Sequence, residues 1–188
     1  MDGKIAIFVF VLIARLGSDQ VNAQVCTHPY CRTGYTYDAA TNFCYKYVGT
    51  PATYAAATQY CANDCSAIAS IRFSQENDFI DKLILQSNTN VNKKTWIGFA
   101  VNTQAVQWQW TDQGPITYTN WYQNKPVTAG CINGVAPWGN GNGCVNFQPT
   151  GSGCDGGSNY WENFYSCATA LPFVCKQTPI CGSAGKSS

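Results

Sequence analysis

TWIGFAV, at residues 95–101, and VQWQWT, at residues 106–111, are rich in aromatic and β-branched side chains. This composition favours β-strands, and Gly114-Pro115 marks the turn that follows them. We therefore expect two strands whose large side chains build the core. The residues that we assign to the core on this basis are Trp96, Ile97, Gly98, Trp108 and Trp110.

Two helices are predicted before these strands and one buried strand after them. Residues 52–62 (ATYAAATQYCA) are alanine-rich and predict the first helix. Ser74 can cap the second helix, where Glu76 and Asp78 in the first turn complement the helix dipole. Residues 171–175 (LPFVC) predict the final strand. An apolar stripe at helical spacing extends the second helix through Phe79, Ile80, Leu83 and Ile84.

The composition changes between Gly130 and Gly157, where nine of the 17 glycines fall. Asparagines are interleaved with these glycines, and regular structure is expected to resume near Tyr160. Long irregular segments in compact domains are usually functional. We therefore expect the binding surface to lie in this glycine-rich segment.

The N-terminus predicts export from the cell. A polar start containing Lys4 precedes the apolar run IAIFVFVLIA at 5–14, and Val21-Asn22-Ala23 offers small residues to signal peptidase. The run is shorter than the about 20 residues that span a bilayer. Eleven cysteines fit a secreted, disulfide-stapled protein. The expected organisation is a signal peptide at 1–23, a short segment at 24–30, one domain at 31–176 and a tail at 177–188.

Charge and residue chemistry exclude two classes of function. Charged residues make up 11% of the chain and the net charge is +1, which leaves no basic face for nucleic acid. His28 is the one histidine, which argues against a Ser-His-Asp triad, and no Gly-x-Ser-x-Gly elbow occurs. We therefore predict a protein that is not an enzyme.

A set of motifs follows the order found in one known family. They are Cys31 and Cys44, Tyr45-Lys46-Tyr47, Cys61, AIASI at 67–71 with Glu76 and Phe79, Trp96-Ile97-Gly98-Phe99, Tyr118-Thr119-Asn120-Trp121 with Pro126, Cys144-Val145, Cys167 and Pro172-Phe173-Val174-Cys175. In this order the chain resembles a C-type lectin-like domain of the long form over nearly its whole mature length. The resemblance implies an α+β fold, with two helices flanking small antiparallel sheets and a long upper loop that serves as the usual binding surface.

The resemblance also implies three disulfides, Cys31–Cys44, Cys61–Cys175 and Cys144–Cys167. Cys131 and Cys154 both lie in the glycine-rich segment, and we predict that they pair.

Three cysteines remain, Cys26, Cys65 and Cys181. Because the chain ends lie close together in this fold, we suggest a Cys26–Cys181 bond. One cysteine is then left over, either as a buried free thiol or as a link between two chains. A metal site at Cys26, His28 and Cys31 is disfavoured because secretion exposes such thiols to oxidation.

Calcium-dependent members of the family bind sugar hydroxyls through one Ca²⁺ in the long loop. Their ligands come from a Glu-Pro-Asn or Gln-Pro-Asp triplet, a later acidic residue and a Trp-Asn-Asp triplet. The first triplet is here Lys125-Pro126-Val127, which offers no side-chain oxygen and brings a cation. At 4 Å and an effective dielectric near 20, an ammonium and Ca²⁺ repel by about 8 kcal/mol.

The second triplet aligns either with Glu162-Asn163-Phe164 or with Trp161-Glu162-Asn163. Asp155 and Glu162 are the only acidic residues between Gln113 and Cys167, a thin supply for an ion that takes six to eight oxygens. We therefore expect no cofactor, and Ca²⁺-dependent sugar binding that is weak or absent.

An aromatic and amide-rich surface is left as the binding candidate. Aromatic rings stack on sugar rings and amides bond to hydroxyls, but Tyr and Trp serve protein interfaces equally well. Trp121 and Trp161 are explained at least as well by packing under the loop. Lys125 is either a solvated loop charge or, as a sharper hypothesis, pairs with Glu162 or Asp155 in place of a calcium ion. The candidate ligand-binding residues are Tyr122, Asn124, Lys125, Trp138, Glu162 and Asn163.

Three functions stay open at this point. The first is a secreted module that recognises a glycan or an extracellular protein without calcium. The second is a calcium-dependent lectin with a rearranged site built from Asn124, Asp155, Glu162 and Asn163. The third is a structural secreted protein that forms disulfide-linked dimers through the odd cysteine. None of the three involves nucleic acid or a membrane span.

Overall fold

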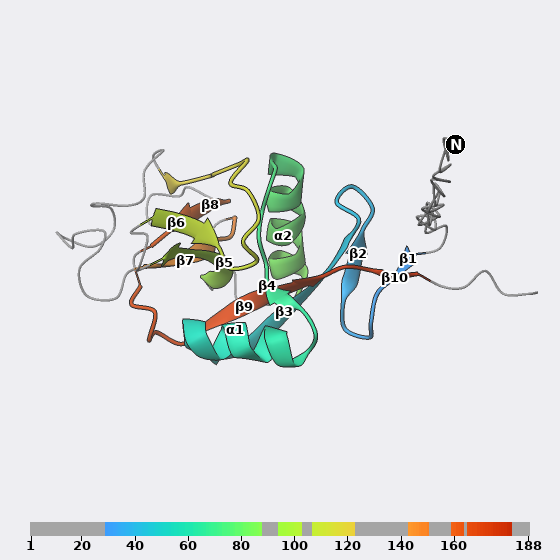
Figure 1. Ribbon diagram of the computed structural model, residues 1–188, viewed down its shortest axis with the longest axis horizontal. Coiled ribbons are helices and arrows are strands. Elements are labelled where there is room, and N and C mark those ends of the chain that lie inside the picture. Colours follow the sequence, from blue (N-terminus) through green and yellow to red (C-terminus); the bar gives the residue numbers. More distant parts are fainter. Residues whose placement is uncertain are drawn as a thin grey trace, which may run out of the picture.

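The computed structural model describes residues 29–87, 94–102, 107–122, 143–150, 159–163 and 165–181. These residues form the expected α+β fold (Figure 1). The helices are α1 (Tyr54–Asn63) and α2 (Ser74–Ser87). The strands are β1 (Pro29–Tyr30), β2 (Thr36–Asp38), β3 (Phe43–Ala52), β4 (Ala67–Ile68), β5 (Thr95–Asn102), β6 (Gln107–Trp110), β7 (Cys144–Gln148), β8 (Tyr160–Glu162), β9 (Leu171–Gln177) and β10 (Ile180–Cys181).

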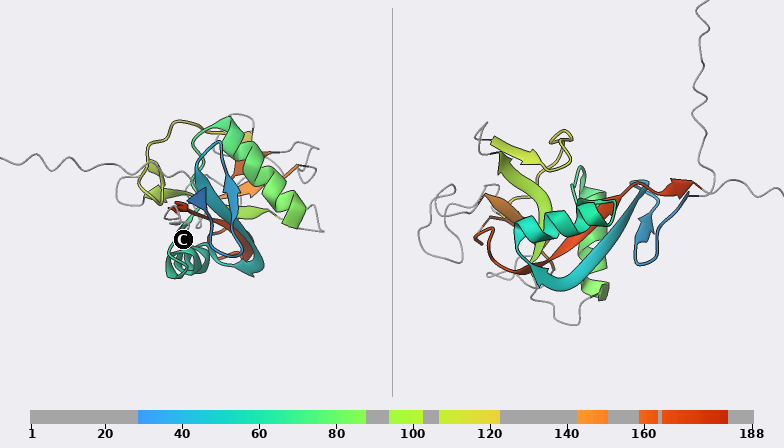
Figure 2. Two further views of the ribbon diagram at one scale, coloured as in Figure 1. Left: turned by 90° about the vertical axis from the view of Figure 1, so that its right-hand side faces the viewer. Right: turned by 60° about the horizontal axis from the view of Figure 1, so that its bottom comes forward.

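The main sheet has the strand order β2-β3-β9-β5-β7-β8, with β4 added to β9 and β6 added to β5. Its centre is β5, which runs parallel to β9 at Trp96↔Phe173 and antiparallel to β6 and β7. The long strands β3 and β9 lie side by side across the molecule (Figure 2). Strands β5 to β8 gather at one end, and the small β1–β10 pair lies at the other (Figure 1).

The predicted core stretch lies in β5, where Trp96, Ile97 and Phe99 are fully buried. Gly98 is required because a Cβ there would meet the carbonyl oxygen of Ile68 at 2.5 Å. This close approach lets the Gly98 amide donate to the Ala69 carbonyl at 2.8 Å. The core expectation for TWIGFAV is therefore confirmed.

The two helices cover two separate apolar clusters. α1 begins after Thr53, whose hydroxyl accepts from the Ala56 amide, and it buries Tyr54, Ala57 and Cys61 beside Trp96. α2 contributes Ile80, Leu83 and Ile84 to the cluster around Phe99, Trp110 and Trp161. Ser74 is the first residue of α2 itself rather than the residue before it.

Glu76 lies in the first turn of α2, as predicted, and it is also a buried ion-pair partner with only 1% of its surface exposed. Its carboxylate accepts from the Lys176 ammonium and the Tyr45 hydroxyl, each at 2.5 Å, and from the Arg72 amide at 2.7 Å. The Lys176 ammonium also donates to the Ser70 carbonyl. Burial lowers the pKa of Lys176 although Glu76 acts against this, and burial raises the pKa of Tyr45 above its ordinary value.

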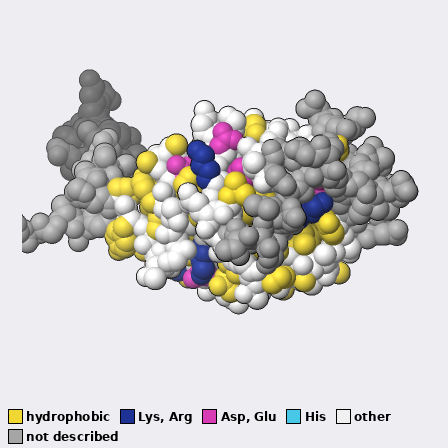
Figure 3. Space-filling view, turned by 180° about the vertical axis from the view of Figure 1, so that it is seen from behind, with side chains coloured by type: hydrophobic (Ala, Val, Ile, Leu, Met, Phe, Trp, Pro, Cys, Tyr) yellow, Lys and Arg dark blue, Asp and Glu magenta, His cyan; other side chains and the backbone are white. Residues whose placement is uncertain are grey.

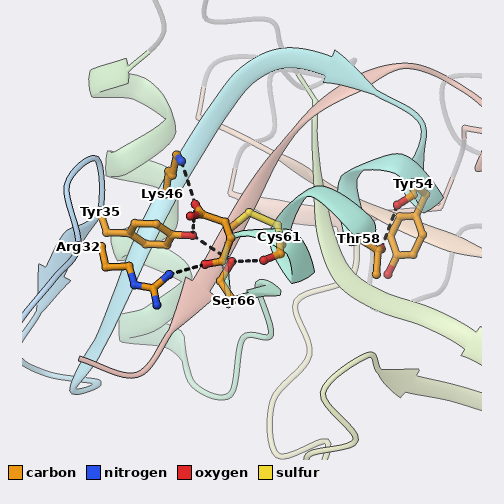
Figure 4. The surroundings of a disulfide bond; sticks show 9 residues. Arg32, Tyr35, Lys46, Tyr54, Thr58, Cys61 and Ser66 are labelled. Atoms are coloured by element: carbon orange, nitrogen blue, oxygen red, sulfur yellow. Dashed lines mark hydrogen bonds and ion pairs between the residues drawn. A yellow bond between two sulfur atoms is a disulfide. The ribbon is translucent and has the colours of Figure 1, made fainter. Parts of the chain in front are cut away.

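The three disulfides implied by the resemblance are confirmed. They are Cys31–Cys44, Cys61–Cys175 and Cys144–Cys167, with Cα–Cα distances of 5.7, 5.5 and 5.5 Å. Beside Cys61, a polar cluster joins the N-terminal strands to the end of α1 (Figure 4). There the Tyr35 hydroxyl lies 2.9 Å from Asp64 and from Ser66, and the Lys46 ammonium is 3.0 Å from Asp64.

The odd thiol is Cys65, which is free and exposed and has a φ of 50°. The sequence interpretation left a buried free thiol open, and exposure of Cys65 speaks against it. Cys181 is disulfide-bonded. Its partner lies outside the described residues, and within them Cys181 of β10 is paired with Pro29 of β1. The bonds Cys26–Cys181 and Cys131–Cys154 stay predictions, because Cys26, Cys131 and Cys154 lie outside the described residues.

The predicted signal peptide also lies outside the described residues, and the domain boundaries stay predictions. The predicted tail at 177–188 begins with Gln177, which is the last residue of β9. It also contains β10 (Ile180–Cys181), which pairs with β1. In the part of the chain that the structure describes, neither helix is long and apolar enough to cross a membrane.

Candidate functional site

Thr150 and Asn159, which lie on either side of residues 151–158, are hydrogen-bonded to α2. The Thr150 amide and hydroxyl donate to the Asp81 carboxylate at 2.8 and 2.5 Å. The Asn159 side-chain amide donates to Asp78 at 2.8 Å, and Asn77 donates to both the carbonyl and the side-chain oxygen of Asn159. The backbone of Asn159 has a φ of 64°, a left-handed conformation that asparagine tolerates. α2 therefore holds Thr150 and Asn159 in fixed positions.

Asn120 and Trp161 are hydrogen-bonded to this same group of residues. The Asn120 side chain donates to the Asn159 carbonyl, and its own carbonyl accepts from the Trp161 amide at 2.7 Å. The Trp161 indole donates to Asn77 at 2.8 Å. These contacts explain why Trp161 is completely buried.

A cluster of aromatic rings centred on Phe99 packs against Trp161. Phe99 touches four indole rings, with centroid distances of 4.4 Å to Trp110, 5.6 Å to Trp108, and 5.7 Å to Trp121 and Trp161. Such contacts are each worth about 0.5–1.5 kcal/mol beyond their buried area. Packing under the loop therefore accounts for Trp121 and Trp161.

The central polar residue of the site is Glu162 in β8. It is fully buried and lies directly opposite Asn146 of β7. The Lys94 ammonium is 3.0 Å from Glu162 Oε2 and 4.9 Å from the centre of the Tyr165 ring. Lys94 is the cation that the sequence interpretation missed, because it sought a partner for Glu162 only in the long loop. Its only sequence signal is a position two residues before Trp96, at the start of the strand.

Two oxygens of this site have no hydrogen-bond partner, Glu162 Oε1 and Asn146 Oδ1. The Asn146 side-chain amide reaches Glu162 Oε2 at 3.5 Å, the limit of a hydrogen bond. Buried acceptors without partners are uncommon and call for an explanation. The hydrogen-bonding capacity of this site is therefore less completely used than that of the network around Glu76.

The described residues do not fit a calcium site. Ca²⁺ takes six to eight oxygens, several of them carboxylate. Glu162 is the one carboxylate here, and the Lys94 ammonium already neutralises it at 3.0 Å. Within the described ranges, no group of three or more His, Cys, Asp or Glu side chains is placed to hold a metal ion.

The predicted site residues fall into two groups. Tyr122 lies against Tyr160, with ring centroids 4.7 Å apart, while Glu162 and Asn163 are buried at the end of β8. Asn124, Lys125 and Trp138 lie outside the described residues, as does Asp155, so the suggested pairing of Lys125 with Glu162 or Asp155 stays a prediction. On the face seen in Figure 3, the charged side chains of the described residues are scattered and both signs occur.

Fold, disulfides and site together define a lectin-like domain. A family model described as "Lectin C-type domain" matches residues 50–177, and the chain belongs to this family.

Two curated proteins show how far this likeness extends. A protein named "Lectin" from Pleurodeles waltl is 28% identical over 184 residues, which cover 96% of this chain and 95% of the relative. The C-type mannose receptor 2 of Mus musculus is 27% identical over 150 residues, which cover 79% of this chain. The chain spans only 9% of that receptor's length.

Among solved structures, the "Ca2+-independent C-type lectin SPL-2 from Saxidomus purpuratus" has a similar fold. Its TM-score is 0.61 at 21% identity, over 79% of this chain and 94% of that chain.

Proposed function

We propose that this protein is a secreted recognition module that binds a glycan without calcium. The observation that carries the proposal is the ion pair between Lys94 and Glu162, in which an ammonium holds the one carboxylate that a calcium site would need. A resident ammonium lets the base of the site keep its shape without a divalent ion. The family is generally non-enzymatic, and we propose no catalytic activity.

Two comparisons support the proposal. The Pleurodeles waltl relative that matches nearly end to end is named a lectin. SPL-2, which shares the fold, is described as calcium-independent. Extracellular localisation follows from the predicted signal peptide and from three disulfides in the described part of the chain.

Glycan-array binding of the oxidised mature protein in chelator tests the proposal. We expect the same glycans to be bound in chelator and in millimolar Ca²⁺, with no change in unfolding temperature. A ligand at 100 times its Kd stabilises a fold by about 2.7 kcal/mol, a shift of several degrees for a domain of this size. Stabilisation by Ca²⁺, or binding lost in chelator, would favour the rearranged calcium-dependent lectin instead.

A second candidate function is a disulfide-linked dimer, and exposure of the free thiol of Cys65 favours it. Electrophoresis without reductant tests it directly. The dimer is supported if a band of twice the mass appears and is lost in Cys65→Ser. A monomer band in both proteins would refute it.

A further inference from the structure

A polar cavity lies along the β5–β6 hairpin, apart from the Glu162 site. It has a volume of about 520 Å³, within the range of about 300–1,000 Å³ typical of small-molecule sites. In Figure 1, β6 lies at the end of the molecule opposite β1 and β10. Its lining includes Asn102, Gln107, Trp108, Gln109, Thr111, Gln113 and Ile116.

The alternation of the hairpin explains the chemistry of this cavity. Trp108 and Trp110 project from one face of β6 and stack on Phe99 in the core. Gln107 and Gln109 project from the opposite face, paired across the hairpin with Asn102 and Ala100. One face of the hairpin therefore carries the tryptophans, with Trp110 buried and Trp108 partly buried at the cavity wall, and the other presents carboxamides to the cavity.

The lining is polar without being charged. Asn102, Gln107, Gln109 and Gln113 contribute four carboxamides to the lining, and Thr111 also lines the cavity. A carboxamide both donates and accepts hydrogen bonds, as a sugar hydroxyl does. Ile116, 47% exposed, adds an apolar surface at the rim.

The wall of the cavity is preorganised by the turn after β6. Asp112 accepts from Arg72 at 2.7 Å and from the Gly114 amide at 3.0 Å. A Cβ on Gly114 would lie 2.0 Å from the Arg72 guanidinium, so glycine lets the turn close over this ion pair. The Arg72 guanidinium is therefore already neutralised by the Asp112 carboxylate and does not attract an anion into the cavity.

We propose that this cavity is a second glycan subsite, which takes a neutral, hydroxyl-rich saccharide unit through the carboxamides of Asn102, Gln107, Gln109 and Gln113. The inference rests on the proposed function, since it assigns a second contact region to the same recognition module. Phosphorylated, sulfated and carboxylated sugars are disfavoured here, because none of the described residues that line the cavity supplies a positive charge.

The test follows the backbone and side-chain amide resonances of the ¹⁵N-labelled oxidised mature protein in chelator. The probes are neutral oligosaccharides of glucose, galactose, mannose and N-acetylglucosamine. We expect at least one of them to shift the amides of Gln107 and Gln109. We also expect Gln107→Ala to weaken that binding about 2–10-fold, the equivalent of one neutral hydrogen bond. Gln107 is exposed, so its replacement leaves the fold intact.

Gln59→Ala is the matched control, because Gln59 is an exposed glutamine on α1, outside the cavity. It is expected to leave the affinity unchanged. Sugar-induced shifts confined to Tyr122 and Asn163, with unchanged affinity in Gln107→Ala, overturn the second subsite and keep the proposed function. Absence of any shift with every probe overturns both.

Discussion

Two buried lysine–glutamate pairs hold opposite parts of the domain, and they differ in how completely they are satisfied. Lys176 and Glu76 join β9 to α2, and the carboxylate also accepts from the Tyr45 hydroxyl and the Arg72 amide. Lys94 and Glu162 lie at the base of the glycine-rich segment, where Glu162 Oε1 has no partner. The first pair is saturated, and the second is not.

The difference separates a structural network from a binding region. A buried polar group without a partner costs about 1–3 kcal/mol, so natural cores avoid it. Incomplete satisfaction at Glu162 is therefore informative, because it falls beside the segment that the family uses for ligands. The saturated pair at Glu76 locks the helix that carries Asp78 and Asp81, and thus supports the site from a distance.

The largest effect is expected when the saturated pair is broken. Lys176→Met leaves Glu76 charged and buried, and losing one partner of a buried pair costs about 3–5 kcal/mol. We expect chemical denaturation of the oxidised domain to show a loss of this size. Lys82→Met is the control, because Lys82 is an exposed lysine on α2. Equal stability of the two variants would contradict the assignment of Glu76 as a fully buried partner.

A smaller loss is expected at the unsaturated pair. Lys94 keeps 13% of its side chain exposed, so water can reach part of the site after Lys94→Met. We expect a loss of about 1–3 kcal/mol, the cost of one unsatisfied buried group.

Calcium gives the Lys94 variant a second readout. We expect the unfolding temperature of Lys94→Met to rise in millimolar Ca²⁺, because the released carboxylate attracts a cation. The original protein is expected not to respond, and Lys94→Arg should behave like it because the charge is kept. A rise in unfolding temperature with Ca²⁺ in all three proteins would mean that Lys94 does not control calcium binding.

Removing both charges sharpens the comparison. We expect Glu162→Gln to recover about 1–2 kcal/mol in the Lys94→Met background, within the usual range for coupled neighbours. Glu76→Leu should recover little in the Lys176→Met background, because the Tyr45 hydroxyl and the Arg72 amide then lose their acceptor. Two double-mutant cycles measured by denaturation give both coupling energies. Similar recovery in the two backgrounds would mean that the pairs do not differ in saturation.

Local pattern was enough to predict most of the fold. The apolar stripe of α2 shows helical periodicity, while the strand around Trp96 and the strand at 171–175 are recognisable from their aromatic, β-branched and apolar composition. The family resemblance added the three disulfides, which join residues up to 114 positions apart.

The ion pairs could not be predicted in the same way. Glu76 fits a helix N-terminus by sequence, yet β9 delivers Lys176 to it from 100 positions away. Lys94 meets Glu162 only because β5, β7 and β8 are neighbours in the sheet. Of the six candidate ligand-binding residues, only Tyr122, Glu162 and Asn163 lie in the described ranges, and their grouping depends on the same strand order.

The smallest effect is expected at a third pair, Lys46 and Asp64, whose side chains are 24% and 33% exposed. A hydrogen bond from Lys46, followed by one from Tyr35, holds the pKa of Asp64 below its ordinary value of 3.8. The folded state therefore binds this proton less readily than the unfolded chain, so Asp64 stabilises the fold above pH 3.8 and stops doing so as the pH falls through its folded pKa.

We expect the loss of unfolding temperature between pH 5 and about pH 2 to be slightly smaller in Asp64→Asn, because that variant has no carboxylate to protonate. Exposure and salt screening keep the effect of such a pair small. Added salt should weaken the Lys46–Asp64 contribution while leaving the cost of Lys176→Met nearly unchanged. If salt changed both equally, burial would not be what ranks the three pairs.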